Sequence, residues 1–431
     1  MDHPDAILER VRQADIAFMH GDTTAPARFD SLWPHLQSAW QQMQTRQDEA
    51  AWLWLSDFAG SFVHLFNLRI PPAERIPYLQ TAIAAAQALE DKNALGIHLN
   101  NLGNAYKATG QMEKAIIHYQ QALALARELG DRQNIGSRLG NLGRVYAALG
   151  RTDEAIAYYQ QALAVTRAVG DRRNEGIWLG NLGNAYAALG RMDAATEHFR
   201  QALTIAQEMG DKQSESHHLG NLGAASYRMG RSRDAIVYYQ RALNITQEIG
   251  DKRSQGAQLG NLGVIYKNTG QLEKAVEYYQ QALALAREVG DNRAQGVHLG
   301  NLGALYLQLG RMEDAAVHLI QALAIARIIG DKPGESARLG QLARVYADLG
   351  QIDDAIAYHQ QALTIAQEIG DRRSAGLHAW NLGVMYEKQG DYARAAMLMQ
   401  MLVDYERAVG HPDAEKDAQY VARVSEKGRT Q

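Results

Sequence analysis

The 431-residue chain carries a formal net charge of −4, is 21% charged and contains no cysteine. These values exclude disulfides, thiolate metal ligands and a cysteine nucleophile, and they give no electrostatic reason to expect binding to nucleic acid or to an anionic membrane. The N-terminal stretch has acidic residues where a signal peptide has basic ones, and no apolar run is long enough to span a membrane. We therefore expect a soluble, cytoplasmic protein.

The chain begins with a helical region that is predicted over residues 1–50. A degenerate repeat is predicted next, over 51–90, because YLQTAIAAAQALED (78–91) aligns with HYQQALALARELGD (118–131) further along the chain. We expect its first helix to be one aromatic-rich helix over 50–67. Six prolines precede residue 78 and only two follow, so the remainder is predicted to be almost continuously helical.

Eight repeats of 40 residues follow, and they fill positions 91–410. Each opens with aspartate and closes with glycine, as in the repeat from Asp171 to Gly210. Glycine is favoured just after a helix, and aspartate is favoured just before one, so Gly190 and Gly210 should each end a helix and Asp171 should begin one. Each repeat is thus predicted to be a helical hairpin that stacks on its neighbours. A capping helix at about 413–424 and a tail complete the predicted domains, within 411–431.

The repeats share the pattern N-L-G-x-x-Y-x-x-x-G-x-x-x-x-A-x-x-x-x-x-x-A-L, as at Asn141 to Leu163. This pattern resembles the tetratricopeptide repeat, and its 40-residue form is similar to the repeats of Pins/LGN-type adaptors and kinesin light chains. The resemblance implies an all-α fold, a right-handed superhelix (α-solenoid) of about nine hairpins with the first helices on the concave side. Ser226, Gln341 and Ala343 depart from the pattern.

The segment LGNLG occurs five times, first at 139–143, although glycine costs about 1 kcal/mol against alanine inside a helix. In the resembled family, the Gly143 position is where the two helices of a hairpin approach most closely. Gly140 should point either towards the next helix or into the inner groove. Both glycines are interpreted as close-packing positions, because a phosphate-binding loop would lie between a strand and a helix.

Asparagine recurs within this segment, where its amide can either read the backbone of a bound peptide or bond a neighbouring helix. Both interpretations stay open. The series is Asn101, Asn141, Asn181, Asn221, Asn261, Asn301 and Asn381. Positions three residues after and three residues before it vary between repeats, as expected for groove residues that set specificity. The groove candidates among them are Asn104, Arg144, Asn184, Arg344, Arg138, Arg338 and Trp178.

Basic residues outnumber acidic ones on the predicted first helices, which favours an acidic ligand. Arg228 joins the groove candidates on this ground, and Arg138/Arg144 and Arg338/Arg344 are predicted to form two similar pairs. In the segments 97–109, 137–149 and so on through 377–389, the basic residues are Lys107, Arg138, Arg144, Arg228, Lys267, Arg338, Arg344 and Lys388, whereas the acidic ones are Asp348 and Glu387. Solvated side chains at helix edges would give the same count.

No catalytic or metal motif is found in the sequence: the chain has no Walker A, HExxH or GxSxG segment, so we expect neither an enzyme nor a cofactor. His98, His218, His298 and His378 share one repeat position, but whole repeats separate them, which excludes a common metal shell. They are interpreted as surface or groove histidines.

Residues 29–43 and 68–89 resemble the segment that precedes the tetratricopeptide sensor of bacterial STAND NTPases. The resemblance implies attachment to an upstream NTPase module or a free-standing relative of such a sensor. We therefore predict a scaffold or sensor that binds a protein or peptide ligand, without nucleic acid or membrane. The alternative is a structural array that assembles with copies of itself, because near-identical repeats can stack end to end.

Overall fold

The computed structural model describes residues 3–429, and every regular element in that range is an α-helix. The chain forms two compact units, which meet in sequence at Ser214 and Glu215. The helices up to this boundary are α1 (Pro4–Met19), α2 (Ala25–Gln44), α3 (Glu49–Gly60), α4 (Val63–Arg69), α5 (Pro72–Ala88), α6 (Lys92–Ala108), α7 (Met112–Glu128), α8 (Arg132–Ala148), α9 (Thr152–Val169), α10 (Arg172–Ala188) and α11 (Met192–Glu208).

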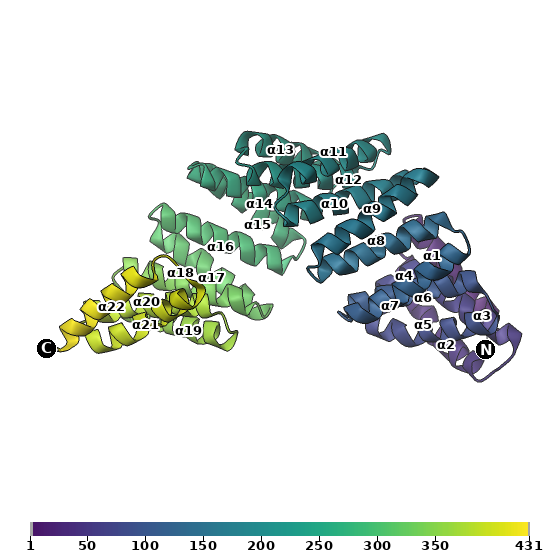
Figure 1. Ribbon diagram of the computed structural model, residues 1–431, viewed down its shortest axis with the longest axis horizontal. Coiled ribbons are helices and arrows are strands. Elements are labelled where there is room, and N and C mark those ends of the chain that lie inside the picture. Colours follow the sequence, from purple (N-terminus) through teal and green to yellow (C-terminus); the bar gives the residue numbers. More distant parts are fainter. Residues whose placement is uncertain (1–2, 430–431) are drawn as a thin grey trace. The chain divides into compact units, whose positions relative to one another are not determined.

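The boundary falls in α12 (Lys212–Arg228). The helices after it are α13 (Ser232–Glu248), α14 (Lys252–Asn268), α15 (Leu272–Glu288), α16 (Asn292–Gln308), α17 (Met312–Ile328), α18 (Lys332–Asp348), α19 (Ile352–Glu368), α20 (Arg372–Lys388), α21 (Tyr392–Val409) and α22 (Ala414–Arg429). Within each unit, helices that follow one another in the chain pack as antiparallel hairpins, as Figure 1 shows. The all-α class and the hairpin repeat are thus as predicted.

Each repeat has its helix ends where aspartate and glycine predict them. The Asp171 carboxylate accepts a hydrogen bond of 3.1 Å from the backbone N–H of Asn174, which satisfies a free donor in the first turn of α10. Gly170, just before it, has φ +73°, in the left-handed region that glycine enters without steric cost. A glycine with positive φ recurs at every twentieth residue from Gly110 to Gly410. These glycines therefore fix the combined length of each helix and the turn that follows it at 20 residues.

The two helices of a hairpin meet at the second glycine of LGNLG. A Cβ at Gly143 would lie 2.6 Å from Cε1 of Tyr159 on the partner helix, far inside van der Waals contact. The Tyr159 side chain is 3% exposed, so it packs flat against the bare backbone of α8. The close-packing interpretation of Gly143 is confirmed.

The first helix of the degenerate repeat differs from the prediction, because the expected single helix over 50–67 is two helices, α3 and α4. The chain turns at Phe62, whose φ of −145° and ψ of 46° are not helical. Asp15 of α1 stabilises the break: its carboxylate accepts hydrogen bonds from the Leu65 backbone N–H (2.6 Å) and from the His64 ring (2.9 Å). It thus caps the N-terminus of α4 from outside the repeat.

The C-terminal helix exists and is longer than the predicted 413–424, since α22 extends to Arg429. It packs on α21 through the buried side chains of Val421 and Val424. Its Tyr420 hydroxyl donates a hydrogen bond of 2.7 Å to Glu387 on α20. The polar bond and the apolar contacts together cover the last hairpin.

Candidate functional site

The exposed side of the first helices holds most of the predicted groove residues, and we call it the first-helix face. It comprises, in each repeat, the asparagine of LGNLG and the residue three positions later. Asn261 and Asn381 are exposed there, and so are Asn184, Arg144 and Arg344. Half-buried side chains at these positions are Asn101, Asn104, Asn181, Asn221 and Asn301. Arg228, near the end of α12, is exposed as well.

In the N-terminal unit, amide side chains bond across neighbouring repeats. Nδ2 of Asn141 donates to Oδ1 of Asn100 at 2.7 Å, and the Arg144 guanidinium donates to Oδ1 of Asn141. Asn141 is 7% exposed, so its amide stabilises the contact between α6 and α8. Within one hairpin, Asn104 accepts a hydrogen bond of 2.7 Å from the Tyr119 hydroxyl. For Asn141 the structure therefore shows the bond to a neighbouring helix.

Positive charge collects beside this amide cluster. Lys107 is half-buried, and burial together with the nearby Arg144 lowers the pKa of its ammonium group. No acidic residue lies among the first-helix positions of the two repeats involved, from 97 to 109 and from 137 to 149. The face of α6 and α8 thus carries positive charge next to the half-buried amides of Asn101 and Asn104.

The position three residues before the asparagine lies between repeats. The Trp178 indole, 3% exposed, packs on Gly140 of the preceding repeat, where a Cβ would overlap its ring. The Arg338 guanidinium packs in the same way on Gly300 and donates a hydrogen bond of 2.9 Å to Gln341. Arg138 is also buried, at 7% exposure. Gly140 was expected to point either towards the next helix or into the inner groove, and the structure shows that it faces the neighbouring repeat.

These placements separate the predicted arginine pairs. Arg138 and Arg338 are held in contacts between repeats, and burial lowers the pKa of both guanidinium groups. Arg144 and Arg344 are exposed, and Arg344 lies 3.8 Å from the Asp348 carboxylate. The two members of each pair therefore meet different surroundings.

The shared histidine position is also buried, so the interpretation of these residues as surface or groove histidines is wrong. Their exposed fractions are 3% for His98, 6% for His218, 7% for His298 and 9% for His378. The imidazole packs on the glycine of the preceding repeat, as at Gly260, where a Cβ would lie 2.7 Å from Cε1 of His298. The helical pattern of one repeat does not reveal this contact, because the partner lies one repeat earlier.

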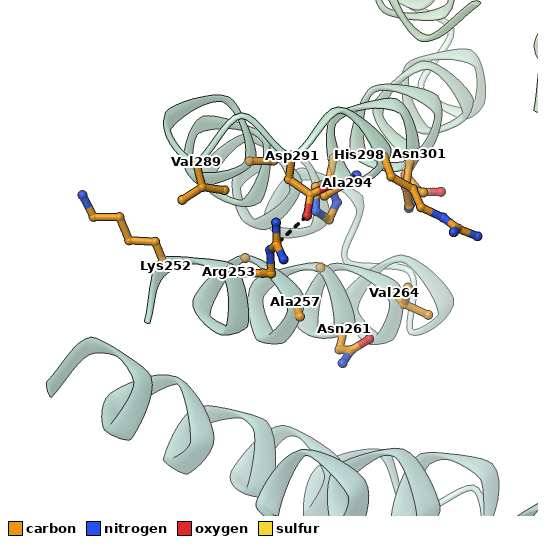
Figure 2. A pocket seen from close by; sticks show the side chains of 15 residues that line it. Lys252, Arg253, Ala257, Asn261, Val264, Val289, Asp291, Ala294, His298 and Asn301 are labelled. Carbon is orange, nitrogen blue, oxygen red and sulfur yellow. Dashed lines mark hydrogen bonds and ion pairs between the residues drawn. The ribbon is translucent and has the colours of Figure 1, made fainter. Parts of the chain in front are cut away.

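One pocket in the C-terminal unit was not predicted. It has a volume of about 380 Å³ and lies between α14 and α16, with Ala286 and Val289 from the end of α15. Gly256, Ala257 and Gly260 form its α14 wall, and small side chains there leave the space open. Figure 2 shows His298 between the two helices, with Lys252 and Val289 at one end and Val264 and Asn301 at the other. Two glycines flanking an alanine are the sequence signal that could have indicated it.

Basic side chains surround this pocket. Lys252, Arg253 and Arg293 line it together with one acidic residue, Asp291. The Arg253 guanidinium lies 3.3 Å from the Asp291 carboxylate, the contact dashed in Figure 2. A pocket of this size with apolar walls and a few polar groups is typical of a ligand site.

Residues 3–429 contain neither a metal-binding cluster nor a membrane-spanning helix. No group of three or more histidine, aspartate or glutamate side chains is placed to hold a metal ion there. None of the helices in this range is long and apolar enough to cross a membrane.

Comparison with known proteins identifies the repeat. The family model described as the tetratricopeptide repeat matches residues 76–128, 135–208, 174–248, 254–328 and 335–405. Comparison with curated proteins gives no match.

Several solved structures share the fold at low sequence identity. A Pyrococcus horikoshii STAND protein with a tetratricopeptide repeat sensor is 17% identical over 86% of this chain, with a TM-score of 0.63. This chain spans only 55% of that protein's length. The apo quorum sensor NprR from Bacillus thuringiensis is 15% identical, with a TM-score of 0.56 over 84% of this chain and 98% of its own. Because the family model covers most of the sequence, the chain belongs to the tetratricopeptide repeat family.

Proposed function

We propose that the protein binds an extended, acidic segment of a partner protein along its first-helix face. The observation that carries this proposal is the charge on that face. In the first-helix segments 97–109, 137–149 and their equivalents through 377–389, six basic side chains are exposed or half-exposed: Lys107, Arg144, Arg228, Lys267, Arg344 and Lys388. The whole chain, by contrast, has a net charge of −4.

The two acidic residues in segments 97–109 and their equivalents through 377–389 already have basic partners. Asp348 lies beside Arg344, and Glu387 accepts a hydrogen bond of 3.0 Å from Lys427 as well as the bond from Tyr420. They therefore offer little repulsion to an incoming carboxylate. Half-exposed asparagines alternate with the basic residues, and an amide can donate to a peptide carbonyl and accept from a peptide N–H.

Charge reversal tests the proposal. The double variant Arg144→Glu with Arg344→Glu should weaken binding of a fluorescein-labelled decapeptide of alternating glutamate and serine by at least about tenfold at low salt. Salt should weaken binding to the unmodified protein more than binding to the variant. Fluorescence anisotropy measures both quantities.

A matched control keeps the net charge equal. Arg200→Glu with Arg241→Glu changes one exposed arginine in each unit, on second helices, and should leave binding of the peptide unchanged. The proposal is wrong if both double variants behave alike, or if a lysine-serine decapeptide binds the protein more tightly than the glutamate-serine one.

The wider role that we infer is a ligand-sensing region of a signalling protein. The fold shared with the sensor-bearing STAND protein supports this inference. The other candidate, a self-assembling array, predicts a sedimentation coefficient that rises with protein concentration, whereas a sensor that binds a separate partner predicts one that stays constant.

A further inference from the structure

Two contacts between repeats contain the same serine–histidine hydrogen bond. The hydroxyl of Ser56 lies 3.0 Å from Nε2 of His98, and the hydroxyl of Ser336 lies 3.2 Å from Nε2 of His378. Serine and histidine are 42 residues apart in each case, so they occupy equivalent positions in consecutive repeats. The buried imidazole thus has a polar partner supplied by the preceding first helix.

The equivalent partner of His298 is Gly256, which has no hydroxyl to offer. The His298 ring has the same position as the His378 ring, since each lies over a glycine of the preceding repeat, Gly260 or Gly340, at nearly the same distance. Nδ1 is buried without a hydrogen-bond partner among residues 3–429 in His98, His298 and His378 alike, so the contacts differ at Nε2, the atom beside which Ser56 and Ser336 lie. What differs is the space beside the ring, and it forms part of the 380 Å³ pocket.

Two equivalent pockets are smaller because an arginine side chain lies in each of them. The pocket beside Gly96 and Arg138 has a volume of about 10 Å³, and the one beside Gly296 and Arg338 has about 140 Å³. All three pockets have glycine at the same position of the first helix. A fourth pocket, of about 330 Å³, lies beside Gly376 at the same position and has no histidine in its lining. Glycine and histidine are also combined at Gly176 and His218, where a Cβ on the glycine would lie 3.2 Å from Ile205. Of the four pockets, the one at Gly256 has an imidazole in its wall.

The chemistry of this pocket is specific. Its walls are apolar, with Val264, Val289 and Val297 around the ring. Burial lowers the pKa of His298, which keeps its imidazole neutral at pH 7, so the ring can exchange one hydrogen bond with a hydroxyl. Arg293 stands at the border, and Asp291 lies beside Arg253 instead, whereas Lys252 is already paired with Glu288.

We propose that this pocket receives the side chain of a tyrosine in the acidic segment, with the phenol hydroxyl placed at His298 where other repeats place serine. The proposal rests on the proposed function and names the residue that anchors the ligand. A tyrosine ring supplies a large apolar surface with a polar tip, which matches apolar walls that contain one imidazole. A carboxylate next to the tyrosine meets Arg293.

The test compares two labelled decapeptides of glutamate and serine that differ at one central residue, tyrosine or phenylalanine. The unmodified protein should bind the tyrosine peptide about fivefold to tenfold more tightly, because phenylalanine leaves the imidazole without its partner. Long-range ¹H–¹⁵N spectra of the histidine rings should show the His298 resonances shifting with the tyrosine peptide only.

Gly256→Ser supplies the missing hydroxyl from within the protein. A Cβ there would lie 3.7 Å from the Ala282 carbonyl oxygen, an ordinary contact, so the variant should fold with an unchanged melting curve. It should bind the tyrosine and phenylalanine peptides equally and weakly. Gly96→Ser has the same room, with its nearest contact at 3.7 Å, and should keep the preference for tyrosine.

The outcomes separate the two proposals. Equal affinity for both peptides in the unmodified protein, with binding still sensitive to Arg144 and Arg344, overturns the tyrosine pocket and leaves the acidic-segment proposal in place. A preference for tyrosine that survives in Gly256→Ser overturns the assignment to this pocket. Failure of every acidic peptide to bind overturns both proposals.

Discussion

The contacts centred on His298 and on His378 use the same parts and differ in one of them. Each has a histidine over a glycine, Gly260 or Gly340, and each has an alanine beside it on the preceding first helix. Ser336 closes the contact at His378, whereas Gly256 leaves the contact at His298 open. One small side chain therefore distinguishes a closed contact from an open one, although the histidine and the glycine under it keep the same positions.

The largest expected effect comes from emptying a closed contact. Trp178→Ala should lower the free energy of unfolding by about 3–5 kcal/mol, because the indole fills the space over Gly140. His298→Ala should cost clearly less, since the pocket already leaves one side of that ring without packing partners. Urea unfolding followed by far-UV circular dichroism measures both. Equal losses would contradict the distinction between closed and open contacts.

Adding a methyl group at one repeat position should give opposite results in two contacts. Gly140→Ala places its Cβ inside the rigid indole of Trp178 and should cost about 1–3 kcal/mol. Gly220→Ala meets the end of a flexible side chain instead, with Nε2 of Gln258 at 3.1 Å. That amide can move aside, so the gain in helix propensity should leave this variant as stable as the unmodified protein or slightly more stable. Thermal melts of the pair measure the difference, and similar melting temperatures would refute the steric explanation.

Opening a closed contact should create a second binding site. Ser336→Gly removes the hydroxyl that bonds both His378 and the Ala362 carbonyl oxygen, at an expected cost of about 1–2 kcal/mol. The variant should then bind two tyrosine peptides in place of one, as isothermal titration calorimetry would report. Ser336→Ala keeps the Cβ and should stay at one site. A stoichiometry of one in the glycine variant would show that a missing serine is insufficient to open a pocket.

The smallest expected effect is on pH dependence. Burial lowers the pKa of His98 to about 4, below the value of about 6.5 that it has when unfolded. The unfolded chain therefore binds this proton first, and stability is lost as the pH falls from about 6.5 towards about 4. Between pH 7 and pH 6, this one histidine should cost about 0.7 kcal/mol.

His98→Gln should remove that share of the pH dependence, and glutamine is tolerated at the equivalent position of another repeat, Gln258. His20→Gln changes an exposed histidine at the end of α1 and serves as the control. An unchanged slope of stability against pH in His98→Gln would contradict the burial argument.

The sequence predicted the features that depend on neighbours in the chain. Asp171 and Gly170 set a helix boundary through their own hydrogen bond and backbone angle, and Gly143 meets Tyr159 within one hairpin. The break at Phe62 could not be predicted in this way, because the residue that caps α4 is Asp15, fifty residues earlier. The prediction of a single helix over 50–67 did not take that distant carboxylate into account.

The candidate site was predictable only where side chains face solvent. Arg144 and Arg344 are exposed as the first-helix pattern suggested, whereas Trp178 and Arg138 fill spaces that belong to the preceding repeat. The pattern within one repeat gives the direction of a side chain around its helix, and the neighbouring repeat decides whether that direction is open. The pocket at His298 can be predicted only when the sequences of both repeats are considered together.

Because each contact between repeats takes its histidine from one repeat and its serine or glycine from the one before, the order of the repeats is itself informative. Removing residues 251–290 would preserve the 40-residue register and bring Ser216 opposite His298, in place of Gly256. In the shortened chain, His298 would lie opposite a serine and would form a closed contact like the one between Ser336 and His378. Repeats of nearly the same sequence are therefore not interchangeable modules, and a shuffled array made from the same eight would present different pockets in a different sequence along its length.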